Sequence, residues 1–577
     1  MYLDGKILIG KTWDMEDVVI YPSMANRHGL IAGATGTGKT ITLKVLAESF
    51  SDAGVPVFLA DAKGDLAGMF REGDMNENVV SRVQSMGLAE RGFTAKAYPT
   101  TFWDVFQEKG IPLRTTVSEM GPLLLGRVLG LNETQSAILN VVFKIADDEG
   151  LILIDTKDLR SMLRYVSENA SEYSMQYGSM AKQSIAAIIR AVVALEAEGG
   201  EMFFGEPALN IEDLLKCDMS MRGMIHVLAS EKLMLSPKMY AAFMLWLISE
   251  LFESLPEAGD MAKPRMVFFF DEAHMLFDDA PKELVSKVEQ LVKLIRSKGV
   301  GIYFVTQNPR DLPDGVLSQL GNKIQHALRA YTPAEQKSIK AAAQGFRENP
   351  AFDTVEVLSE LGTGQALISV LGPDGVPTIV QKAKVLPPQS LMGAVPDADR
   401  AMMIQQSMYQ LKYAEMFDRD SAYELLERLH LDREEAAADQ AEADRLAKEQ
   451  AKLEAEQAKA LAKQQAADER EQARLEREAK KAEERAAAAE ERERLRKERE
   501  EAKAKERAAA AAAKEEERKK KVVSTEMGKV GRTVAGTVGR EVGNTVGKSV
   551  GGTFGKKLGG NLGATLARGI FNTFTKK

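Results

Sequence analysis

The sequence has little cysteine and no long apolar runs. Cys217 is the single cysteine in 577 residues, so no intramolecular disulfide can form and a reducing compartment is expected. The most apolar helical candidate, residues 241–252, is too short for a bilayer and contains Glu250, so we expect a buried helix and no transmembrane span. The first residues, MYLDGKILIGKTW, lack the basic and then apolar order of a signal peptide. These absences favour a cytoplasmic protein.

Charge is distributed unevenly along the chain. Residues 1–432 contain 42 Lys and Arg against 57 Asp and Glu, whereas residues 522–577 contain 9 against 2. Residues 433–521 are balanced, with 25 of each sign. An acidic body is therefore joined to a basic tail. The acidic body gives no global reason to attract DNA, because sequence-independent DNA binding depends on Lys and Arg at the phosphates.

Apolar runs typical of strands alternate with helical patterns up to about residue 388. This alternation predicts an α/β fold with a mostly parallel sheet covered by helices. The strand candidates are residues 29–32, 55–61, 224–229, 265–271, 300–306 and 323–330, and the main helix candidates are residues 40–51, 237–255 and 281–298. Residues 366–385 predict two further strands around a Pro-Asp-Gly turn that close the domain.

The remaining segments predict helical additions. We expect residues 1–28 to be a short lead-in to a domain of residues 29–388, and residues 100–200, which show no evident strand, to be a large helical insertion in it. Residues 389–432 predict a helical connector.

Residues 433–521 consist almost entirely of strong helix formers such as Ala, Glu, Lys, Arg and Gln. The leucines there are too sparse and irregular for a clear heptad seam, so a solvated charged helix and a weak alanine-rich coiled coil both fit.

The last segment, residues 522–577, is a basic glycine repeat. A small residue recurs every four positions, at Gly531, Ala535, Gly539, Gly543, Gly547, Gly551, Gly555, Gly559 and Gly563. Each glycine costs about 1 kcal/mol of helix propensity relative to alanine, so a helix here needs a partner. The alternatives are another copy or the acidic body, a membrane surface at the inner face, and nucleic acid.

The stretch LIAGATGTGKT contains the pattern G-x-x-x-x-G-K-[ST] between an apolar strand and a helical pattern. Amides of such a loop converge on phosphates, the lysine reaches the β and γ phosphates, and the final hydroxyl is a Mg²⁺ ligand. The sequence therefore predicts an ATP and Mg²⁺ site, with Thr40 on the metal. Its loop is Gly33, Ala34, Thr35, Gly36, Thr37, Gly38, Lys39 and Thr40.

The segment RMVFFFDEAH supplies the groups that hydrolysis needs. Asp271 ends an apolar strand and is predicted to hold magnesium through water, and Glu272 can orient or deprotonate the attacking water. The strand VGIYFVTQ ends at Gln307. If this strand lies between the P-loop strand and the Asp271 strand, Gln307 points at the γ phosphate and acts as a sensor.

Taken together, GATGTGKT, VFLADAKGD, FFFDEAH and RSKGVGIYFVTQNP resemble the HerA/FtsK clade of P-loop motor ATPases. NRHGLIAGATGTGKT, GPLLLGRVLGLNETQ and FFGEPALNIEDL are similar to a bacterial HerA-like subgroup typified by YjgR. The resemblance covers about residues 1–388. It implies a RecA-like (ASCE) P-loop NTPase domain, a homo-oligomeric, hexameric ring with ATP sites between subunits, and double-stranded DNA as the load.

The resemblance also implies an arginine inserted from the neighbouring subunit to stabilise transition-state charge. Arg296, shortly before the sensor strand, matches that position, and Arg329 and Arg347 are the alternatives. The small β-barrel that opens HerA, and the membrane anchor and winged helix of FtsK, are not expected here.

Three functions stay open at this point. The first is a Mg-ATP-driven ring motor of the helicase or DNA-translocase type. The second is an ATPase of the same fold that acts on protein or on membrane-associated assemblies. The third is a nucleotide-bound scaffold in which residues 433–577 dominate.

Overall fold

The computed structural model describes residues 1–277, 282–330, 332–476 and 493–497. The chain divides into two units, Met1–Ala438 and Asp439–Lys577. All strands and the helices that pack on them belong to the first unit.

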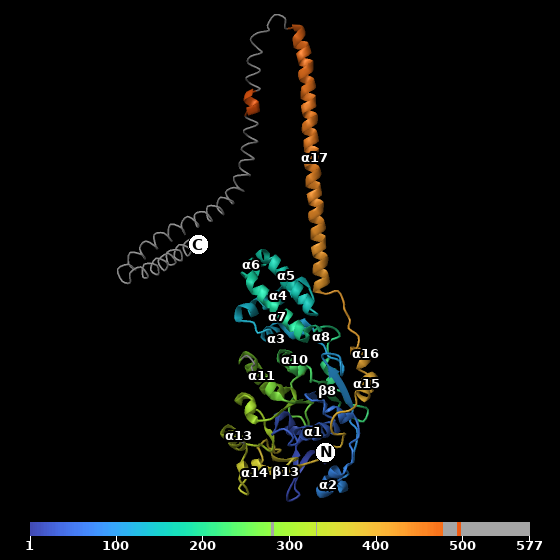
Figure 1. The fold of residues 1–577 in the computed structure, drawn as a ribbon, viewed down its shortest axis with the longest axis vertical. Helices are drawn as coiled ribbons and strands as arrows, with labels where there is room; N and C mark the ends of the chain where they lie inside the picture. Colours follow the sequence, from blue (N-terminus) through green and yellow to red (C-terminus); the bar gives the residue numbers. More distant parts are fainter. Residues whose placement is uncertain (278–281, 331, 477–492, 498–577) are drawn as a thin grey trace, which may run out of the picture. The chain divides into compact units, whose positions relative to one another are not determined.

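A 13-stranded sheet runs through the described part of the first unit (Figure 1). Its order is β1-β2-β13-β12-β11-β4-β10-β9-β5-β8-β6-β7, with β3 paired to β2. From β11 to β7 every pairing is parallel, which confirms the predicted α/β fold. These strands are Asn322–His326 (β11), Gly29–Ala32 (β4), Val300–Thr306 (β10), Met266–Phe270 (β9), Val57–Asp61 (β5), Ile225–Ala229 (β8), Thr100–Asp104 (β6) and Ile111–Pro112 (β7).

One edge of the sheet is antiparallel. It consists of Gln365–Ser369 (β12), Gln381–Val385 (β13), Lys6–Thr12 (β2), Tyr2–Leu3 (β1) and Asp17–Ile20 (β3). Gln365 pairs with Lys384, so the two strands predicted around the Pro-Asp-Gly turn are confirmed.

Residues 1–28 are not a lead-in outside the domain. Strand β2 pairs with β13, and its Ile7 and Ile9 are fully buried in the same core cluster as Phe50. A 3-10 turn, Pro22–Arg27 (η1), then leads into β4. The correction has a physical reason: the partner of β2 lies at the far end of the domain in sequence, so local pattern could not place it.

Helices cover both faces of the sheet, and side chains alternate between them along the buried strands. Phe268 and Phe270 of β9 pack in one core cluster with Phe243, whereas Phe269 packs in the other with Phe50. This alternation follows from the two-residue period of a strand. The covering helices are Lys39–Asp52 (α1), Glu77–Ser85 (α2), Pro237–Ser254 (α10), Lys282–Ile295 (α11), Asp314–Leu317 (α12), Pro333–Gln344 (α13) and Thr354–Glu360 (α14).

The insertion is helical but begins later than expected. Figure 1 shows α3 to α7 grouped beyond α10, at one end of the first unit. The expected range of residues 100–200 also contains β6 and β7, which is a correction: Trp103 of β6 is buried and donates a 3.1 Å hydrogen bond to His226 of β8. The helices are Val117–Val128 (α3), Glu133–Glu149 (α4), Thr156–Glu168 (α5), Ala170–Tyr177 (α6), Lys182–Leu195 (α7), Glu201–Phe203 (α8) and Ile211–Leu214 (α9).

Residues 389–432 contain two short helices and the start of a long one, so the charged helix begins before residue 433. These helices are Asp397–Gln406 (α15), Gln410–Tyr413 (α16) and the first turns of Ala422–Glu476 (α17). The start of α17 is fixed to the insertion, because the buried Asp158 carboxylate accepts hydrogen bonds from Ser421 Oγ (2.5 Å) and the Tyr423 amide (2.8 Å). The predicted glycine-repeat tail, residues 522–577, lies outside the described residues.

No single helix in the described ranges is long and apolar enough to cross a membrane. One sharply bent pair, Ala170–Tyr177 with Lys182–Phe203, passes that test only when its two parts are joined, by length and composition.

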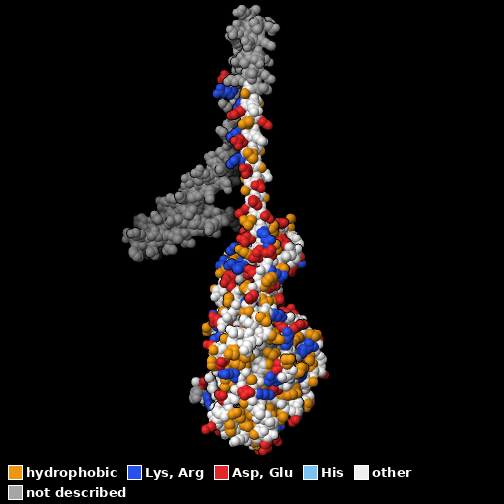
Figure 2. Space-filling view, turned by 90° about the vertical axis from the view of Figure 1, so that its right-hand side faces the viewer, with side chains coloured by type: hydrophobic (Ala, Val, Ile, Leu, Met, Phe, Trp, Pro, Cys, Tyr) orange, Lys and Arg blue, Asp and Glu red, His pale blue; other side chains and the backbone are white. Residues whose placement is uncertain are grey.

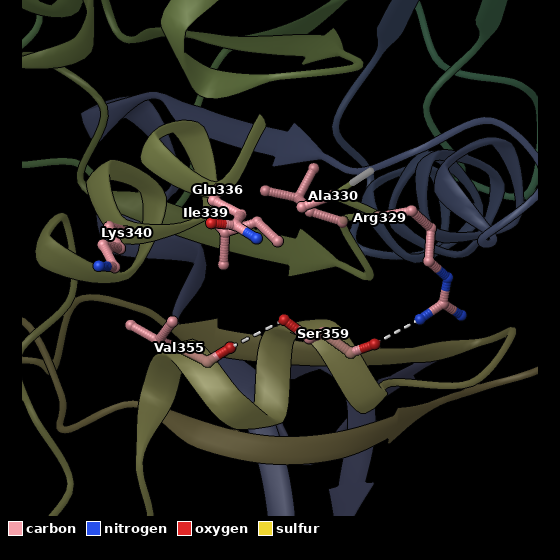
Figure 3. Close-up of a pocket in the computed structure, with 8 residues that line it drawn as sticks. Arg329, Ala330, Gln336, Ile339, Lys340, Val355 and Ser359 are labelled. Atoms are coloured by element: carbon pink, nitrogen blue, oxygen red, sulfur yellow. Dashed lines mark hydrogen bonds between the residues drawn. The ribbon is translucent and has the colours of Figure 1, made fainter. Parts of the chain in front are cut away.

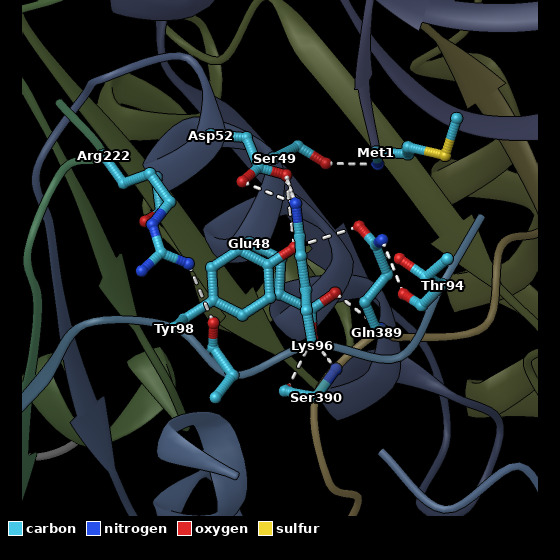
Figure 4. A network of polar contacts seen from close by, with 12 residues as sticks. Met1, Glu48, Ser49, Asp52, Thr94, Lys96, Tyr98, Arg222, Gln389 and Ser390 are labelled. Carbon is cyan, nitrogen blue, oxygen red and sulfur yellow. Dashed lines mark hydrogen bonds and ion pairs between the residues drawn. The ribbon is translucent and has the colours of Figure 1, made fainter. Parts of the chain in front are cut away.

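A buried polar network joins helix α1 to the start of the connector (Figure 4). The Glu48 carboxylate accepts hydrogen bonds from the amides of Gln389 (2.8 Å) and Ser390 (3.0 Å) and from the Ser390 hydroxyl (2.5 Å). Beside it, Tyr98 donates to Gln389 Oε1 at 3.0 Å. Burial raises the pKa of Glu48, and these hydrogen bonds lower it in part. The helix that follows the P-loop is therefore held, through the Glu48 carboxylate, by donors from Gln389 and Ser390.

We predict that Glu48→Ala destabilises the first unit by about 3 kcal/mol, because it leaves two buried amides without an acceptor. Glu48→Gln keeps one carbonyl and should cost about 1 kcal/mol. Urea unfolding followed by circular dichroism measures both. The exposed Glu90→Ala is the control and should change stability by less than about 0.5 kcal/mol. Equal midpoints for Glu48→Ala and the control would contradict the role of the network.

Candidate nucleotide site

The ends of four neighbouring strands meet at one edge of the sheet. In the order β4, β10, β9 and β5 the strands are parallel, with Thr306 opposite Ala32 and Phe304 opposite Phe270. Their carboxyl ends therefore share an edge, as expected for ligand sites in open α/β sheets. Strand β10 lies between the P-loop strand and the Asp271 strand, which is the condition set above for Gln307.

The predicted P-loop connects β4 to α1. Gly36 has φ 77° and Gly38 has φ 116°, backbone values that other residues rarely adopt. At Gly33, an added Cβ would lie 2.5 Å from the His326 Cβ. Thr37 Oγ1 donates to the Ala34 carbonyl at 2.7 Å and closes the turn. Thr35 and Gly36 are exposed and Thr40 is half-buried at the start of α1, so the N-terminal end of that helix faces the loop.

Lys39 lies under this loop and is mostly buried. Its Nζ donates to the Gly33 carbonyl at 2.7 Å. Burial lowers the pKa of Lys39, while the charges of Glu272 and Asp271 raise it in part. The loop therefore places a cation beside two carboxylates, where phosphate oxygens are recognised in sites of this kind.

Asp271 is buried at the end of β9. Its Oδ1 accepts a 3.0 Å hydrogen bond from the Glu272 amide. Burial, and then the neighbouring Glu272 charge, raise the pKa of Asp271 to about 7. A carboxyl in this state ionises readily when a cation is present. Among the described residues there is no group of three or more His, Cys, Asp or Glu that could hold a metal ion. A Mg²⁺ ligand set made of Thr40, Asp271 and phosphate oxygens needs no such group.

Glu272 is held in an unusual backbone conformation. Its φ of 48° lies in the left-handed region, which costs energy for a residue other than glycine and often marks a functional position. Lys63 Nζ lies 2.6 Å from its Oε1, and Gln307 Nε2 donates to its Oε2 at 3.4 Å. Burial raises the pKa of Glu272, but the hydrogen bond and charge of Lys63, with the bond from Gln307, outweigh it and lower the pKa below its ordinary value. The carboxylate is therefore ionised at neutral pH.

A family model described as Helicase HerA-like C-terminal matches residues 6–479. The chain belongs to this HerA-like family. The resemblance to HerA is thus confirmed, whereas the narrower subgroup stays a prediction.

Several HerA-like relatives are similar in part of their length. A probable helicase of Methanocaldococcus jannaschii is 32% identical over 125 residues, which is 21% of this chain and 22% of the relative. The DNA double-strand break repair helicase HerA of Sulfurisphaera tokodaii is 22% identical over 381 residues, 64% of this chain and 67% of that protein. The first of these matches therefore spans less than a quarter of the relative.

Two solved structures have a similar arrangement over about two thirds of this chain. The conjugative coupling protein TrwB matches with a TM-score of 0.45 and 14% identity over 66% of this chain and 89% of that chain. VirB4 of Thermoanaerobacter pseudethanolicus matches with a TM-score of 0.43 and 17% identity over 67% of this chain and 97% of that chain.

Two elements of the HerA-like site were not predicted from the sequence. In the loop after β5, the Asp61 carboxylate accepts hydrogen bonds from the amides of Gly64 (2.8 Å) and Leu66 (3.1 Å), and Lys63 projects from this loop to Glu272. Burial and the charge of Asp65 raise the pKa of Asp61 to about 6. The segment VFLADAKGD contributed to the family resemblance without a role. The sequence pattern that could have pointed to this loop was the group of polar residues directly after the buried strand β5.

The second element is His326 at the end of β11. Its Nδ1 donates to the Gln365 carbonyl (3.0 Å), so Nε2 accepts from Thr42 Oγ1 of α1 (2.8 Å). Burial lowers the pKa of His326 to about 4, so the ring is neutral at pH 7. A neutral histidine thus fixes α1 against β11 directly behind Gly33. In the sequence, His326 was one polar residue within a strand candidate, and no sequence pattern predicted its contact with α1.

Of the three candidate arginines, Arg296 lies away from the P-loop. Arg296 precedes β10 and therefore lies at the opposite end of the strand from Gln307. It lines a polar cleft of about 900 Å³ with Arg27, Lys293 and Asp260. Burial and the charge of Arg27 lower the pKa of Arg296. Neither Arg296 nor Arg27 forms an ion pair with a carboxylate among the described residues. Within one chain, Arg296 cannot contact the nucleotide site.

The alternatives Arg329 and Arg347 have carbonyl partners. Arg329 donates to Ser359 (2.5 Å) and Leu361 (3.0 Å), and Figure 3 shows it at the border of a cavity of about 390 Å³ between α13 and α14. Arg347 donates to the Pro377 carbonyl at 3.2 Å.

We predict that Asp271 destabilises the protein when nucleotide and Mg²⁺ are absent. Its folded pKa of about 7 exceeds the ordinary 3.8, so the folded state holds this proton more tightly and loses stability as pH rises between those values. Asp271→Asn should therefore be more stable than the wild type by about 2–4 kcal/mol at pH 8, with a difference that shrinks towards pH 4.

Urea unfolding in EDTA at a series of pH values measures this difference. Asp374→Asn, in an exposed turn, is the control and should follow the wild type at every pH. An Asp271→Asn curve parallel to the wild type at all pH values would show that the carboxyl is not perturbed.

Proposed function

We propose that this chain is a Mg-ATP-hydrolysing HerA-like ring motor that translocates double-stranded DNA. The observation that carries the proposal is the meeting of Lys39, Asp271, Glu272 and Gln307 at one sheet edge, with an ionised Glu272 held by two donors. A protein that only senses nucleotide needs the P-loop but has no use for a fixed carboxylate beyond it.

In the proposed reaction each group has one task. The amides of Gly33 to Thr40 and the Lys39 ammonium bind the phosphate oxygens of ATP. Thr40 and Asp271, the latter through water, hold Mg²⁺, which when bound neutralises charge on the β and γ oxygens. Glu272 accepts the proton of the water that attacks the γ phosphorus, and Gln307 orients that water. The bond between the γ phosphorus and the β-bridging oxygen breaks as the new bond forms. ADP and Mg²⁺ in one of the TrwB crystal structures agree with these ligands.

The position of Arg296 supports a homo-oligomer, with a hexamer as the ring that the family resemblance implies. Arg296 and Arg27 lie at the end of the sheet opposite to their own P-loop, so they can stabilise transition-state charge only in a neighbouring subunit. In a head-to-tail ring the arginine cleft of one subunit faces the nucleotide edge of the next. Arg296 is the proposed trans-acting arginine, and Arg27 supports it.

DNA as the load is favoured by the relatives, whose names describe helicases and a DNA repair helicase. The face in Figure 2 shows acidic and basic side chains interspersed over the first unit, so DNA contact would depend on local basic sites and not on net charge. The second candidate is an ATPase that acts on protein or membrane-associated assemblies; the basic tail favours it. A cytoplasmic location, at the membrane surface in that second case, belongs to the same proposal.

We predict ATP hydrolysis that requires Lys39 and Glu272 and rises with linear double-stranded DNA. Glu272→Gln should lower kcat by about a hundredfold or more while ATP binding is retained, and Lys39→Ala should weaken ATP binding itself. Steady-state ATP hydrolysis at low and high salt measures kcat, and titration with a fluorescent ATP analogue measures nucleotide affinity. The exposed Glu90→Gln is the matched acid-to-amide control.

Stimulation of hydrolysis by DNA that fades with salt supports a DNA motor. Hydrolysis that ignores DNA at both salts favours a protein load, and activity in Glu272→Gln would exclude the proposed base.

We also predict complementation between two inactive variants. Arg296→Ala should lower kcat by about a hundredfold or more, because a trans-acting arginine has an effect of that size. Lys39→Ala is inactive through its own P-loop but still presents Arg296 to a neighbour. After mixing under conditions that exchange subunits, about a quarter of the interfaces should pair an intact P-loop with an intact arginine. No regain of hydrolysis in such mixtures would exclude action in trans.

A further inference from the structure

Both oxygens of the Glu272 carboxylate are already engaged by protein groups. Lys63 Nζ lies 2.6 Å from Oε1. On Oε2, Gln307 Nε2 donates at 3.4 Å, and His274 Nδ1 lies 3.5 Å away. A proton acceptor should present a free oxygen to water, and a lysine ammonium is the strongest competitor for that oxygen.

The backbone that carries Lys63 is hydrogen-bonded to a buried carboxylate, while its side chain is half exposed. The buried Asp61 carboxylate accepts hydrogen bonds from the amides of Lys63 (3.3 Å), Gly64 (2.8 Å) and Leu66 (3.1 Å), so the loop after β5 is held at three points. The Lys63 side chain is 53% exposed, against 10% for Glu272. A lysine on a flexible four-carbon stem can therefore change partners without any movement of the loop.

A second partner is available where the γ phosphate of ATP would lie. Lys63 is close enough to the P-loop lysine for its charge to act on Lys39, and both Asp271 and Glu272 interact with these two lysines. A γ phosphate carries more charge than one carboxylate and offers three acceptor oxygens. ADP lacks this group, so it offers Lys63 a much weaker alternative.

We propose that Lys63 is a positioning residue that exchanges partners with the state of the nucleotide. Without a γ phosphate it pairs with Glu272 and keeps the carboxylate from water. With ATP bound it moves to the γ phosphate, and Glu272 is released to orient and deprotonate the attacking water. The inference rests on the proposed ATPase function, in which Glu272 is the base, and adds the group that makes this base depend on ATP.

The test is the equilibrium affinity for a non-hydrolysable ATP analogue and for ADP, both with Mg²⁺. Lys63→Met should weaken binding of the analogue by about tenfold, the effect of one charge-assisted contact, and change ADP binding by less than about twofold. Glu272→Gln should tighten analogue binding, because a neutral amide competes less well for the ammonium. In the Lys63→Met background, Glu272→Gln should have no effect on analogue binding.

Two further variants separate this role from a merely structural one. Lys63→Arg keeps the charge and should retain most of the preference for the analogue over ADP. Lys109→Met is the matched control. Lys109 lies in the loop after β6, its side chain is 43% exposed, and it forms an ion pair of 2.8 Å with Glu231. It should leave both affinities unchanged.

The outcomes are distinct. Equal weakening of both nucleotides by Lys63→Met, no weakening, or additive effects of Lys63→Met and Glu272→Gln would each overturn the exchange of partners. A wild type with no Glu272-dependent hydrolysis would overturn the proposed function instead, and the double-variant cycle in nucleotide affinity would still report on Lys63, because it needs no turnover.

Discussion

Two adjacent carboxylates at the buried end of β9 determine the electrostatics of the whole nucleotide edge. Asp271 and Glu272 cannot both be charged there without nearby cations, and Lys39 and Lys63 approach from the loops after β4 and β5. The two carboxyls respond differently because their surroundings differ. Burial and the neighbouring Glu272 charge raise the pKa of Asp271, and its one amide donor offsets only part of this, whereas the Lys63 ammonium lowers the pKa of Glu272. One strand end thus carries a carboxyl with a pKa of about 7 and a carboxylate that is already ionised at neutral pH.

The scaffold around these charges is rigid because its buried polar groups have partners. Asp61 holds the loop after β5, His326 holds α1 against β11, and Glu48 holds the other part of α1 to the start of the connector. Each of these groups is buried and accepts hydrogen bonds from neighbouring segments, so each would leave unpaired donors if it were removed. This rigidity has a functional consequence, because small side-chain movements such as that proposed for Lys63 then occur against a fixed backbone.

The part of the site that the sequence predicted follows from short-range pattern. A glycine-rich loop after an apolar run gave Lys39 and Thr40, and polar residues directly after apolar runs gave Asp271, Glu272 and Gln307. Parallel strands align such ends at one edge, so the meeting of these residues needed no long-range information. Strand β2 and strand β6 were missed because their partners, β13 and β8, lie far away in sequence. Lys63 was missed for the same reason, since its role depends on β5 lying beside β9.

Arg27 shows the same limit and adds an argument about assembly. The 3-10 turn before β4 brings it beside Arg296, although the two residues are 269 positions apart in the chain. Burial, and then the charge of Arg27, lower the pKa of Arg296, and the charge of Asp260 offsets part of this. A bound anion would offset the rest. The phosphates of a nucleotide held by a neighbouring subunit are such an anion, so the cleft that a single chain leaves uncompensated becomes favourable when the proposed ring closes.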